Sequence, residues 1–433
     1  MHLRDLPSFC SHEHWGSIGS FGMEAEGFRA DVVRGATPLR PTGLFDLLLD
    51  PYFGGWLASS GVDHGAVAAK VGQTDLRMIQ TEAVATAWGA FRQAIAHHVA
   101  TGTYQAMRVG MRELYGHDIE KGADPSGLDG LIREAYADTF GWYRRAARKV
   151  GLAQVIRPVH PEYLWRSAGP VHAAAEDGLI GTVLRIDPLL HLWQAASPRR
   201  DALAGELGVD PGDAATWRRF LVALADRAAA RGVVGIKQLQ AYSRDLAYDV
   251  HPDSGVRFRG ELAAGEVRVF QDWVMHECCK LAHERGWPHQ VHVGTHNLPH
   301  SSPLPLAGLA ARYRRMPLVL LHCWPFIREC GWLAWTHPNV FTDTCWLGVL
   351  NPAYLREALN TWMGLVPSHK IMCGHDATSI EMAAGSVTAV RDALGDVLSE
   401  QCRRGAMTEA NARDMAADLL ARNAERLYGV RPA

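Results

Sequence analysis

The chain has 433 residues, of which 48% are hydrophobic and 21% charged, and its formal net charge is −2. This near-neutral balance excludes a broad basic surface for nucleic acid, and no run approaches the ~18 apolar residues that a membrane span needs. Eight cysteines without a C-x-x-C pair, and an N-terminus without a secretory apolar core, indicate reduced thiols and a cytoplasmic location.

The first predicted strand is the run PSFCSHEH, residues 7–14. Residues 15–150 then contain Gly- and Pro-rich turns followed by helical patterns, among them residues 81–100 and 128–150, with nothing strand-like between them. We interpret residues 15–150 as a mainly helical insertion after the first strand.

From about residue 150 the chain alternates short β-favouring runs with longer amphipathic patterns, which is typical of parallel βαβ units. The helical patterns at 216–231 and 266–285 end before glycines, a common helix stop, and the last helix is expected at 408–428. Trp332 and Trp335, three residues apart, are predicted to pack in a helix core. Seven strands are predicted in this part: 152–158, 181–187, 232–238, 288–294, 318–324, 339–345 and 370–376. With the first strand they make eight, the number of a closed (β/α)₈ TIM-like barrel. We expect one domain over residues 1–433, with the insertion covering part of the barrel mouth.

Side chains that can bind metal lie at or just after the ends of these predicted strands. Such a barrel collects its active site at the carboxyl ends of its strands, so these side chains should converge. An isolated His-x-His pair is usually structural, but the repeated coincidence at strand ends indicates a site for zinc, with manganese or iron as alternatives. The candidate metal ligands are His12, His14, Lys237, His292, His322 and Asp376.

Lys237 is the residue that distinguishes between kinds of metal site. A lysine at the end of a buried strand is costly as an ammonium, and its pKa falls on desolvation. The neutral amine could react with carbon dioxide to form a carbamate that bridges two metals. A plain ammonium that pairs with Asp376 or with a substrate carboxylate is an equally weighted alternative. The candidate substrate-binding residues in the following loops are Tyr242, Arg244, His296, Trp324 and Arg328.

This pattern of candidate ligands resembles the amidohydrolase superfamily. The runs GIKQLQAYSRDL, PHQVHVGTHN, LVLLHCWPFIRECGWLAWTHPNVFTD and ARNAERLYG are similar to its amidohydrolase-related branch, which includes domains fused to glutamine synthetase-like modules in nodulin-type and fungal conidiation proteins. The resemblance implies that His12, His14 and Asp376 hold one metal, that carboxylated Lys237 bridges, and that His292 and His322 hold a second. Decarboxylases and uronate isomerases of this branch share the long insertion and use a single metal, so the resemblance leaves one or two divalent ions open.

The resulting hypothesis is a metal-dependent hydrolase that cleaves an amide or related C–N bond of a small polar, carboxylate-bearing substrate. Asp376 would take a proton from a metal-activated water and pass it to the leaving amine, and His322 would polarise the carbonyl or bind the second metal. A mononuclear decarboxylase or sugar-acid isomerase and a non-catalytic barrel module are the alternatives. The binding partner of this protein should be a small molecule, and its self-association is left open.

Overall fold

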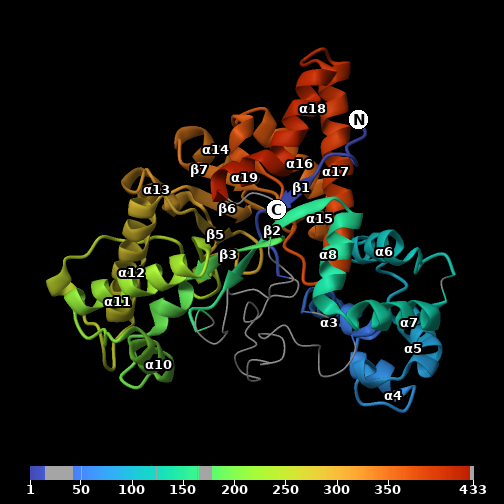
Figure 1. Ribbon diagram of the computed structural model, residues 1–433, viewed down its shortest axis with the longest axis horizontal. Coiled ribbons are helices and arrows are strands. Elements are labelled where there is room, and N and C mark those ends of the chain that lie inside the picture. The colour runs from blue at the N-terminus through green and yellow to red at the C-terminus, as the bar shows by residue number, and fades with distance from the viewer. Residues whose placement is uncertain (15–41, 50, 123, 163, 165–177, 430–433) are drawn as a thin grey trace.

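The computed structural model describes residues 1–14, 42–49, 51–122, 124–162, 164 and 178–429. Eight parallel strands form one sheet in which each strand pairs with the next along the chain, so the predicted (β/α)₈ barrel is confirmed (Figure 1). Each strand lies within a predicted run or exceeds it by one residue. The strands are β1 Ser8–Cys10, β2 Leu152–Val159, β3 Ile180–Arg185, β4 Val233–Gln238, β5 His289–Val293, β6 Leu318–His322, β7 Val340–Asp343 and β8 Ile371–Met372.

The segments that follow β1 and β8 are joined by backbone hydrogen bonds. The amide of Asp376 donates to the carbonyl of His12 over 2.9 Å, and the amide of His14 donates to the carbonyl of Ala377 over 3.1 Å. This connection brings three candidate ligands from the two ends of the chain to one place.

Helices alternate with the later strands and cover the outside of the barrel (Figure 1). They are α10 Pro198–Leu207, α11 Ala214–Ala230, α12 Ala264–Arg285, α13 Ala307–Arg312, α14 Ile327–Thr336, α15 Leu347–Leu350, α16 Pro352–Met363 and α17 Ile380–Arg403. Helix α11 begins before the predicted residue 216, because the Asp213 carboxylate caps it by accepting from the amide of Thr216 over 2.8 Å. Helix α12 ends at Arg285, as predicted, and Gly286 follows it with a φ of 68°.

The predicted single helix at 408–428 is wrong in its middle. The chain forms α18 Glu409–Ala417, a π-helical turn at Asp418–Arg422, and α19 Asn423–Tyr428. The turn inserts an extra residue into the helical repeat and so rotates the last helix about its axis. Tyr428 thereby packs among side chains of the barrel interior, including Phe9 and Met372.

The described part of the insertion is helical, as predicted, and lies to one side of the barrel in Figure 1. Its helices are α2 Leu44–Leu48, α3 Pro51–Ser59, α4 His64–Ala69, α5 Thr81–Ala94, α6 Gly102–Tyr115, α7 Pro125–Tyr136 and α8 Thr139–Lys149. The pattern at 128–150 is thus divided into two helices, and residues 15–41 of the predicted insertion lie outside the described residues. None of the described helices is both long and apolar enough to cross a membrane.

Helix α6 of the insertion crosses α17 of the barrel at unusually short range. A Cβ atom on Gly110 would lie 1.8 Å from the carbonyl oxygen of Glu381, and one on Gly385 would lie 1.8 Å from the carbonyl oxygen of Ala106. Only glycine allows two helix backbones to approach this closely. The two glycines therefore fix the insertion against the barrel.

A buried carboxylate strengthens the same contact. Glu381 accepts hydrogen bonds from the hydroxyls of Tyr115 (2.7 Å) and Tyr136 (2.9 Å) and from the indole of Trp142 (3.3 Å). The three donors come from α6, α7 and α8. One side chain thus joins three insertion helices to α17.

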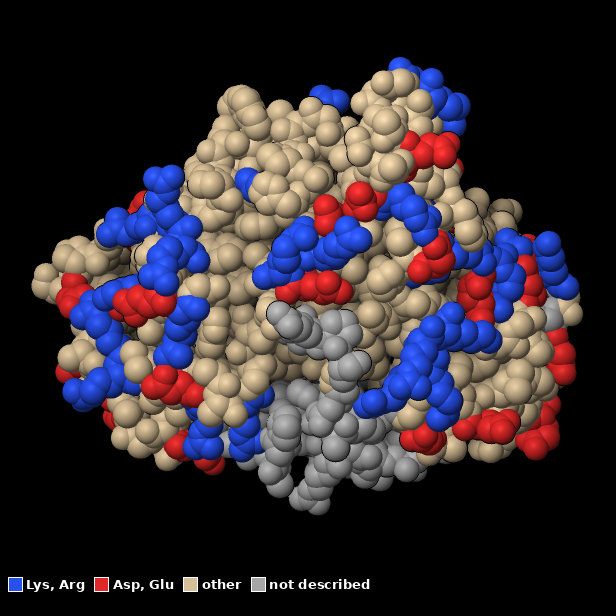
Figure 2. All heavy atoms as spheres, turned by 45° about the horizontal axis from the view of Figure 1, so that its top comes forward, with Lys and Arg blue, Asp and Glu red and all other residues tan. Residues whose placement is uncertain are grey.

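The face in Figure 2 carries acidic and basic side chains interspersed, in agreement with the small net charge.

Trp332 and Trp335, which the helical spacing predicts as core residues, are instead 53% and 54% exposed. Their rings contact each other with centroids 5.0 Å apart on the outer face of α14. That prediction is wrong because a three-residue spacing places two side chains on one face without deciding which face is buried.

Candidate metal centre

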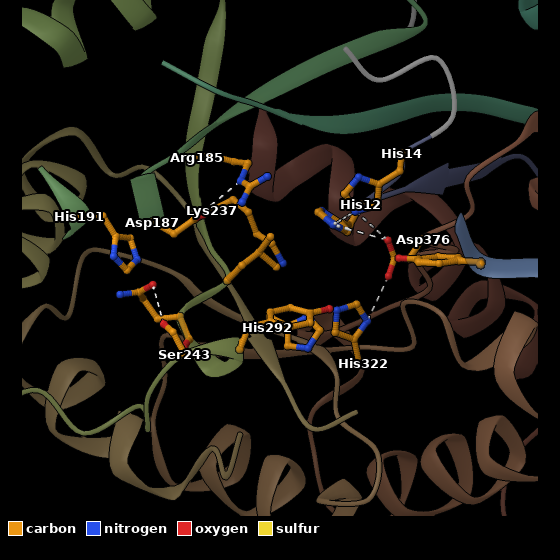
Figure 3. A pocket seen from close by; sticks show the side chains of 14 residues that line it. His12, His14, Arg185, Asp187, His191, Lys237, Ser243, His292, His322 and Asp376 are labelled. Carbon is orange, nitrogen blue, oxygen red and sulfur yellow. Dashed lines mark hydrogen bonds and ion pairs between the residues drawn. The ribbon is translucent and has the colours of Figure 1, made fainter. Parts of the chain in front are cut away.

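A cavity of about 420 Å³ opens at the carboxyl ends of the strands, and all six predicted metal ligands line it (Figure 3). In this view His12, His14 and Asp376 lie on the right, His191 and Asp187 on the left, and Arg185 and Lys237 between them. The lining residues are His12, His14, Tyr52, Arg185, Asp187, His191, Lys237, Leu239, Gln240, Tyr242, Ser243, His292, His322 and Asp376.

The two N-terminal histidines and Asp376 form the tightest group. His14 Nε2 lies 3.1 Å from His12 Nε2 and 3.1 Å from Asp376 Oδ1, and His12 Nε2 lies 3.7 Å from the same oxygen. Strand β1 ends at Cys10, so both histidines project from the segment after the strand and not from the strand itself. Glu13, between them, holds this segment against the segment that follows β8 by accepting from the amides of His14 and Ala377.

Burial decides the protonation of this group. It lowers the pKa of His12 well below its usual value and also lowers that of His14, because the interior disfavours the charged imidazolium. Burial acts in the opposite direction on Asp376, but the adjacent imidazoles, His14 foremost, outweigh it and hold the pKa of this carboxyl well below its usual range. Neutral imidazole nitrogens beside an ionised carboxylate are the donor set of a divalent zinc site, so these residues fit the ion.

A second group shares Asp376. His322 Nδ1 lies 3.4 Å from Asp376 Oδ2, and His322, Cys345 and Asp376 each offer a ligand atom within 4.8 Å of the others. Cys345 is absent from the sequence-based prediction. The imidazole of His292 stands next to His322, with ring centroids 4.4 Å apart, while its Nε2 lies 2.9 Å from the Thr295 hydroxyl.

Backbone strain is concentrated around the same cavity. Five described non-glycine residues have a positive φ, and all five lie at the carboxyl ends of β5 to β8: Thr295 (60°), His322 (67°), Cys323 (61°), Trp346 (69°) and Asp376 (53°). Such conformations cost energy for a residue with a Cβ, and they persist where surrounding structure enforces them, commonly at functional sites.

Lys237 is completely buried in β4, where it pairs in register with Arg185 of β3. Its Nζ has no hydrogen-bond partner among the described residues. Burial lowers the pKa of Lys237 to about 8, although Asp376 opposes that shift. With this pKa about one-tenth of the amine is neutral at pH 7, far more than for an ordinary lysine, and both the carbamate and the ion-pair interpretations allow this.

One predicted substrate-binding residue, Tyr242, lines the cavity, with its ring centroid 4.7 Å from that of His292. A second, His296, is exposed and does not line it, but its Nδ1 lies 3.1 Å from the Tyr242 hydroxyl. His296 also stacks on Trp346, with ring centroids 5.2 Å apart.

The other three do not line this cavity, and their role in substrate binding stays a prediction. Arg244 is buried elsewhere, because its guanidinium pairs with Asp272 at 2.7 Å. Trp324 stacks on Tyr354 with centroids 4.7 Å apart, and Arg328 is exposed on α14. These three residues follow strand ends at distances along the chain similar to those of residues that do line the cavity. The path of each loop decides whether its side chains reach the cavity, and the spacing of the strands does not predict that path.

Several lining residues, among them Tyr52 and Asp187, are missing from the predicted site, whereas Arg185 is a basic candidate at the barrel mouth in the sequence. Tyr52 of α3 hydrogen-bonds Asp376, and burial together with that carboxylate raises the pKa of Tyr52 well above its usual value. On the opposite side, the guanidinium of Arg185 binds both carboxylate oxygens of Asp187, at 3.2 and 2.5 Å, and lies 2.7 Å from His160 Nε2. The insertion carries no strand end to mark Tyr52, so nothing in the local pattern selects it.

Comparison with known proteins supplies the family context. The profile of the family described as Amidohydrolase matches residues 171–430. Protein fluG of Emericella nidulans is 31% identical over 335 residues, which cover 70% of this chain and 35% of the relative, so the chain spans about a third of that protein's length.

Two solved structures resemble nearly the whole chain. The uronate isomerase of Thermotoga maritima has a TM-score of 0.71 and 16% identity, covering 98% of this chain and 95% of its own. The glucuronate isomerase of Caulobacter crescentus has a TM-score of 0.69 and 18% identity, covering 98% and 92%. At these identities the likeness describes the shared fold.

Proposed function

Because this chain belongs to the amidohydrolase family, we propose that it is a metal-dependent hydrolase that cleaves an amide or related C–N bond of a small, polar, carboxylate-bearing substrate. The observation that carries the proposal is Lys237, whose buried Nζ has no hydrogen-bond partner among the described residues and lines the same cavity as the imidazoles and Asp376. A carbamate on that nitrogen would supply the anionic oxygen ligand that a two-metal hydrolytic site requires.

The proposed ion is zinc, because the donors are imidazole nitrogens and a carboxylate, with a thiol nearby; manganese and iron are the alternatives. His12, His14 and Asp376 would hold the first ion, and His322 with His292 or Cys345 would hold a second. When bound, the divalent ion supplies Lewis-acid chemistry and makes water acidic enough to deliver hydroxide near neutral pH.

Asp376 is the proposed proton carrier. Its low pKa keeps it ionised, so it accepts the proton that water loses as the new C–O bond forms. It then delivers this proton to the amine nitrogen as the C–N bond breaks, which balances the reaction. The Tyr52 hydroxyl, hydrogen-bonded to Asp376, orients the carboxylate during both transfers.

The remaining lining residues divide between the carbonyl and the rest of the substrate. Neutral His322 would polarise the carbonyl oxygen, or bind the second ion. Arg185 and Tyr242, which both line the cavity, are the proposed contacts for the substrate carboxylate. Because Asp187 partly neutralises Arg185, it would favour a single carboxylate over a highly charged anion.

A second candidate is isomerisation of a sugar acid, or decarboxylation, on one metal. The contact between Tyr52 and Asp376 favours it, since a hydroxyl and a carboxylate side by side can move a proton between neighbouring substrate atoms without consuming water. The two solved isomerases of the same fold make this candidate worth testing in parallel. A non-catalytic module is disfavoured by the complete donor set.

The test compares Lys237→Met with Lys370→Met. Lys370 is a matched control: burial also lowers the pKa of Lys370 to about 8, but it lies outside the cavity, and its Nζ donates to the carbonyl of His337 over 2.7 Å. We expect purified wild-type protein and Lys370→Met to hold two zinc ions per chain and Lys237→Met to hold one. After ¹³C-bicarbonate labelling, a carbamate NMR signal should disappear only in Lys237→Met.

Turnover of a panel of amides, lactones and uronates should fall with the Lys237 change. Full metal content in Lys237→Met without a carbamate signal would favour the one-metal candidate. Wild-type protein that holds no zinc, manganese or iron even after loading would overturn both enzymatic candidates.

We also propose that residues 1–433 form a single cytoplasmic domain with reduced thiols.

A further inference from the structure

A buried glutamine joins the first metal-ligand segment to the last helix of the chain. Gln290, in β5, is fully buried inside the barrel. Its Nε2 donates to the carbonyl of Ser11 over 2.6 Å and to the hydroxyl of Tyr428 over 2.7 Å. Its Oε1 lies 2.8 Å from Nδ1 of His12. All hydrogen-bonding groups of the amide are thereby used.

These partners fix which ring nitrogen of His12 carries the proton. The Ser11 carbonyl can only accept, so the end of the Gln290 amide that faces it must be the NH₂ group. The other end is then the oxygen, and His12 Nδ1 must donate to it. With Nδ1 protonated, the lone pair of a neutral His12 is on Nε2, the nitrogen that faces His14 and Asp376.

Tyr428 holds the glutamine in this orientation from the opposite end of the barrel interior. It belongs to α19, within the run ARNAERLYG, and its ring stacks on Phe9 of β1 with centroids 6.3 Å apart and an interplanar angle of 11°. In the same helix Asn423 donates to the carbonyls of Ser368 and Ile371, both over 2.7 Å, next to the strand that precedes Asp376. The helix thus contacts both strands that lead to the first ligand group.

We propose that Gln290 and Tyr428 are positioning residues that hold His12 in its Nδ1-protonated form, so that Nε2 is presented to a metal ion shared with His14 and Asp376. This inference rests on the proposed metal-dependent function. It assigns the C-terminal run ARNAERLYG a part in the site, although none of its side chains lines the cavity. Partners that orient a ligating histidine typically contribute 10- to 100-fold to metal affinity.

The first experiment uses metal-free protein. Long-range ¹H–¹⁵N NMR of histidine-labelled protein reports which ring nitrogen is protonated, and a His12→Gln spectrum identifies the His12 signals. We expect the Nδ1–H form in the wild type and in Gln290→Glu, which keeps an acceptor. We expect loss of that single form in Gln290→Leu. The control is Gln154→Leu, because Gln154 is an equally buried glutamine of β2 whose amide makes no hydrogen bond to a described residue.

The second experiment measures zinc affinity by competition with a chelator. Gln290→Leu should bind about 10- to 100-fold more weakly than the wild type. Tyr428→Phe should show a smaller loss, and Gln154→Leu should match the wild type. If Gln290→Leu does not fold, Tyr428→Phe and Gln290→Glu still test whether Gln290 and Tyr428 orient His12.

The outcomes separate this inference from the proposed function. An Nε2–H form of His12 in the wild type, or unchanged affinity in folded Gln290→Leu, would overturn the inference while leaving the metal site intact. Wild-type protein that shows the Nδ1–H form but binds no metal would instead overturn the proposed function.

Discussion

Replacing Gly110 with alanine should push α6 of the insertion away from α17. The added methyl carbon would lie 1.8 Å from the carbonyl oxygen of Glu381, whereas real contacts of this kind are not shorter than 3.0 Å. The two backbones must therefore separate locally by at least about 1.2 Å, the difference between these distances.

The expected cost is a balance of two effects. Overpacking of a close contact usually costs ~1–3 kcal/mol. Alanine in a helix interior recovers up to ~1 kcal/mol relative to glycine. Because the separation also strains the hydrogen bonds of Tyr115, Tyr136 and Trp142 to Glu381, we expect the free energy of unfolding to fall by about 1–2 kcal/mol.

Activity should fall together with stability, because α3, which carries Tyr52, packs against α6. Urea unfolding measures the first effect, and turnover at saturating substrate measures the second. The control is Gly89→Ala in α5, an exposed site where the added Cβ meets nothing within 4 Å. It should stabilise the protein by up to ~1 kcal/mol. Equal stabilisation by Gly110→Ala would refute the close crossing of the two helices.

Three further outcomes follow from particular contacts. Arg108 holds the Asp118 carboxylate at 2.7 and 2.9 Å and lowers the pKa of Asp118 to about 2. The stabilisation is therefore present above the unfolded pKa of 3.8 and is lost as the pH falls towards 2. Asp118→Asn should cost about 1–2 kcal/mol at pH 7 in urea unfolding, and a difference from the wild type that stays constant down to pH 3 would contradict this. In Asp343→Ala the buried amides of Cys345 and Gly374 lose the carboxylate oxygen to which each donates over 2.8 Å. Calorimetry should therefore report a free energy of unfolding lower by about 3 kcal/mol, and Asp343→Asn should have a smaller effect. Zinc at a free concentration 100 times its Kd should stabilise wild-type protein by about 2.7 kcal/mol in thermal unfolding, and a chelator should reverse this stabilisation. A similar response in His14→Ala would argue against a metal site formed by His12, His14 and Asp376.

The sequence alone determined the barrel and most of the candidate metal centre. Apolar β-favouring runs separated by helical patterns predict eight parallel strands, and all eight are present. Lys237, His292, His322 and Asp376 lie at or near the ends of predicted runs, and His12 and His14 lie at the end of the first predicted run, just beyond the observed strand. In a closed parallel sheet every carboxyl end faces the same rim, so local strand spacing is enough to predict that these side chains meet.

Tertiary structure decided the features that depend on contacts between segments far apart in the chain. Tyr52 of the insertion lies beside Asp376, and two glycines let α6 of the same insertion approach α17. Gln290 of β5 contacts both His12 and Tyr428, which come from opposite ends of the chain. Arg244 pairs with Asp272 and does not line the cavity, and the two tryptophans of α14 face outward although their spacing predicts core packing. Hydrophobic periodicity predicts which face of a segment is apolar. It does not predict which other segment packs against that face, because this depends on the fold of the whole chain.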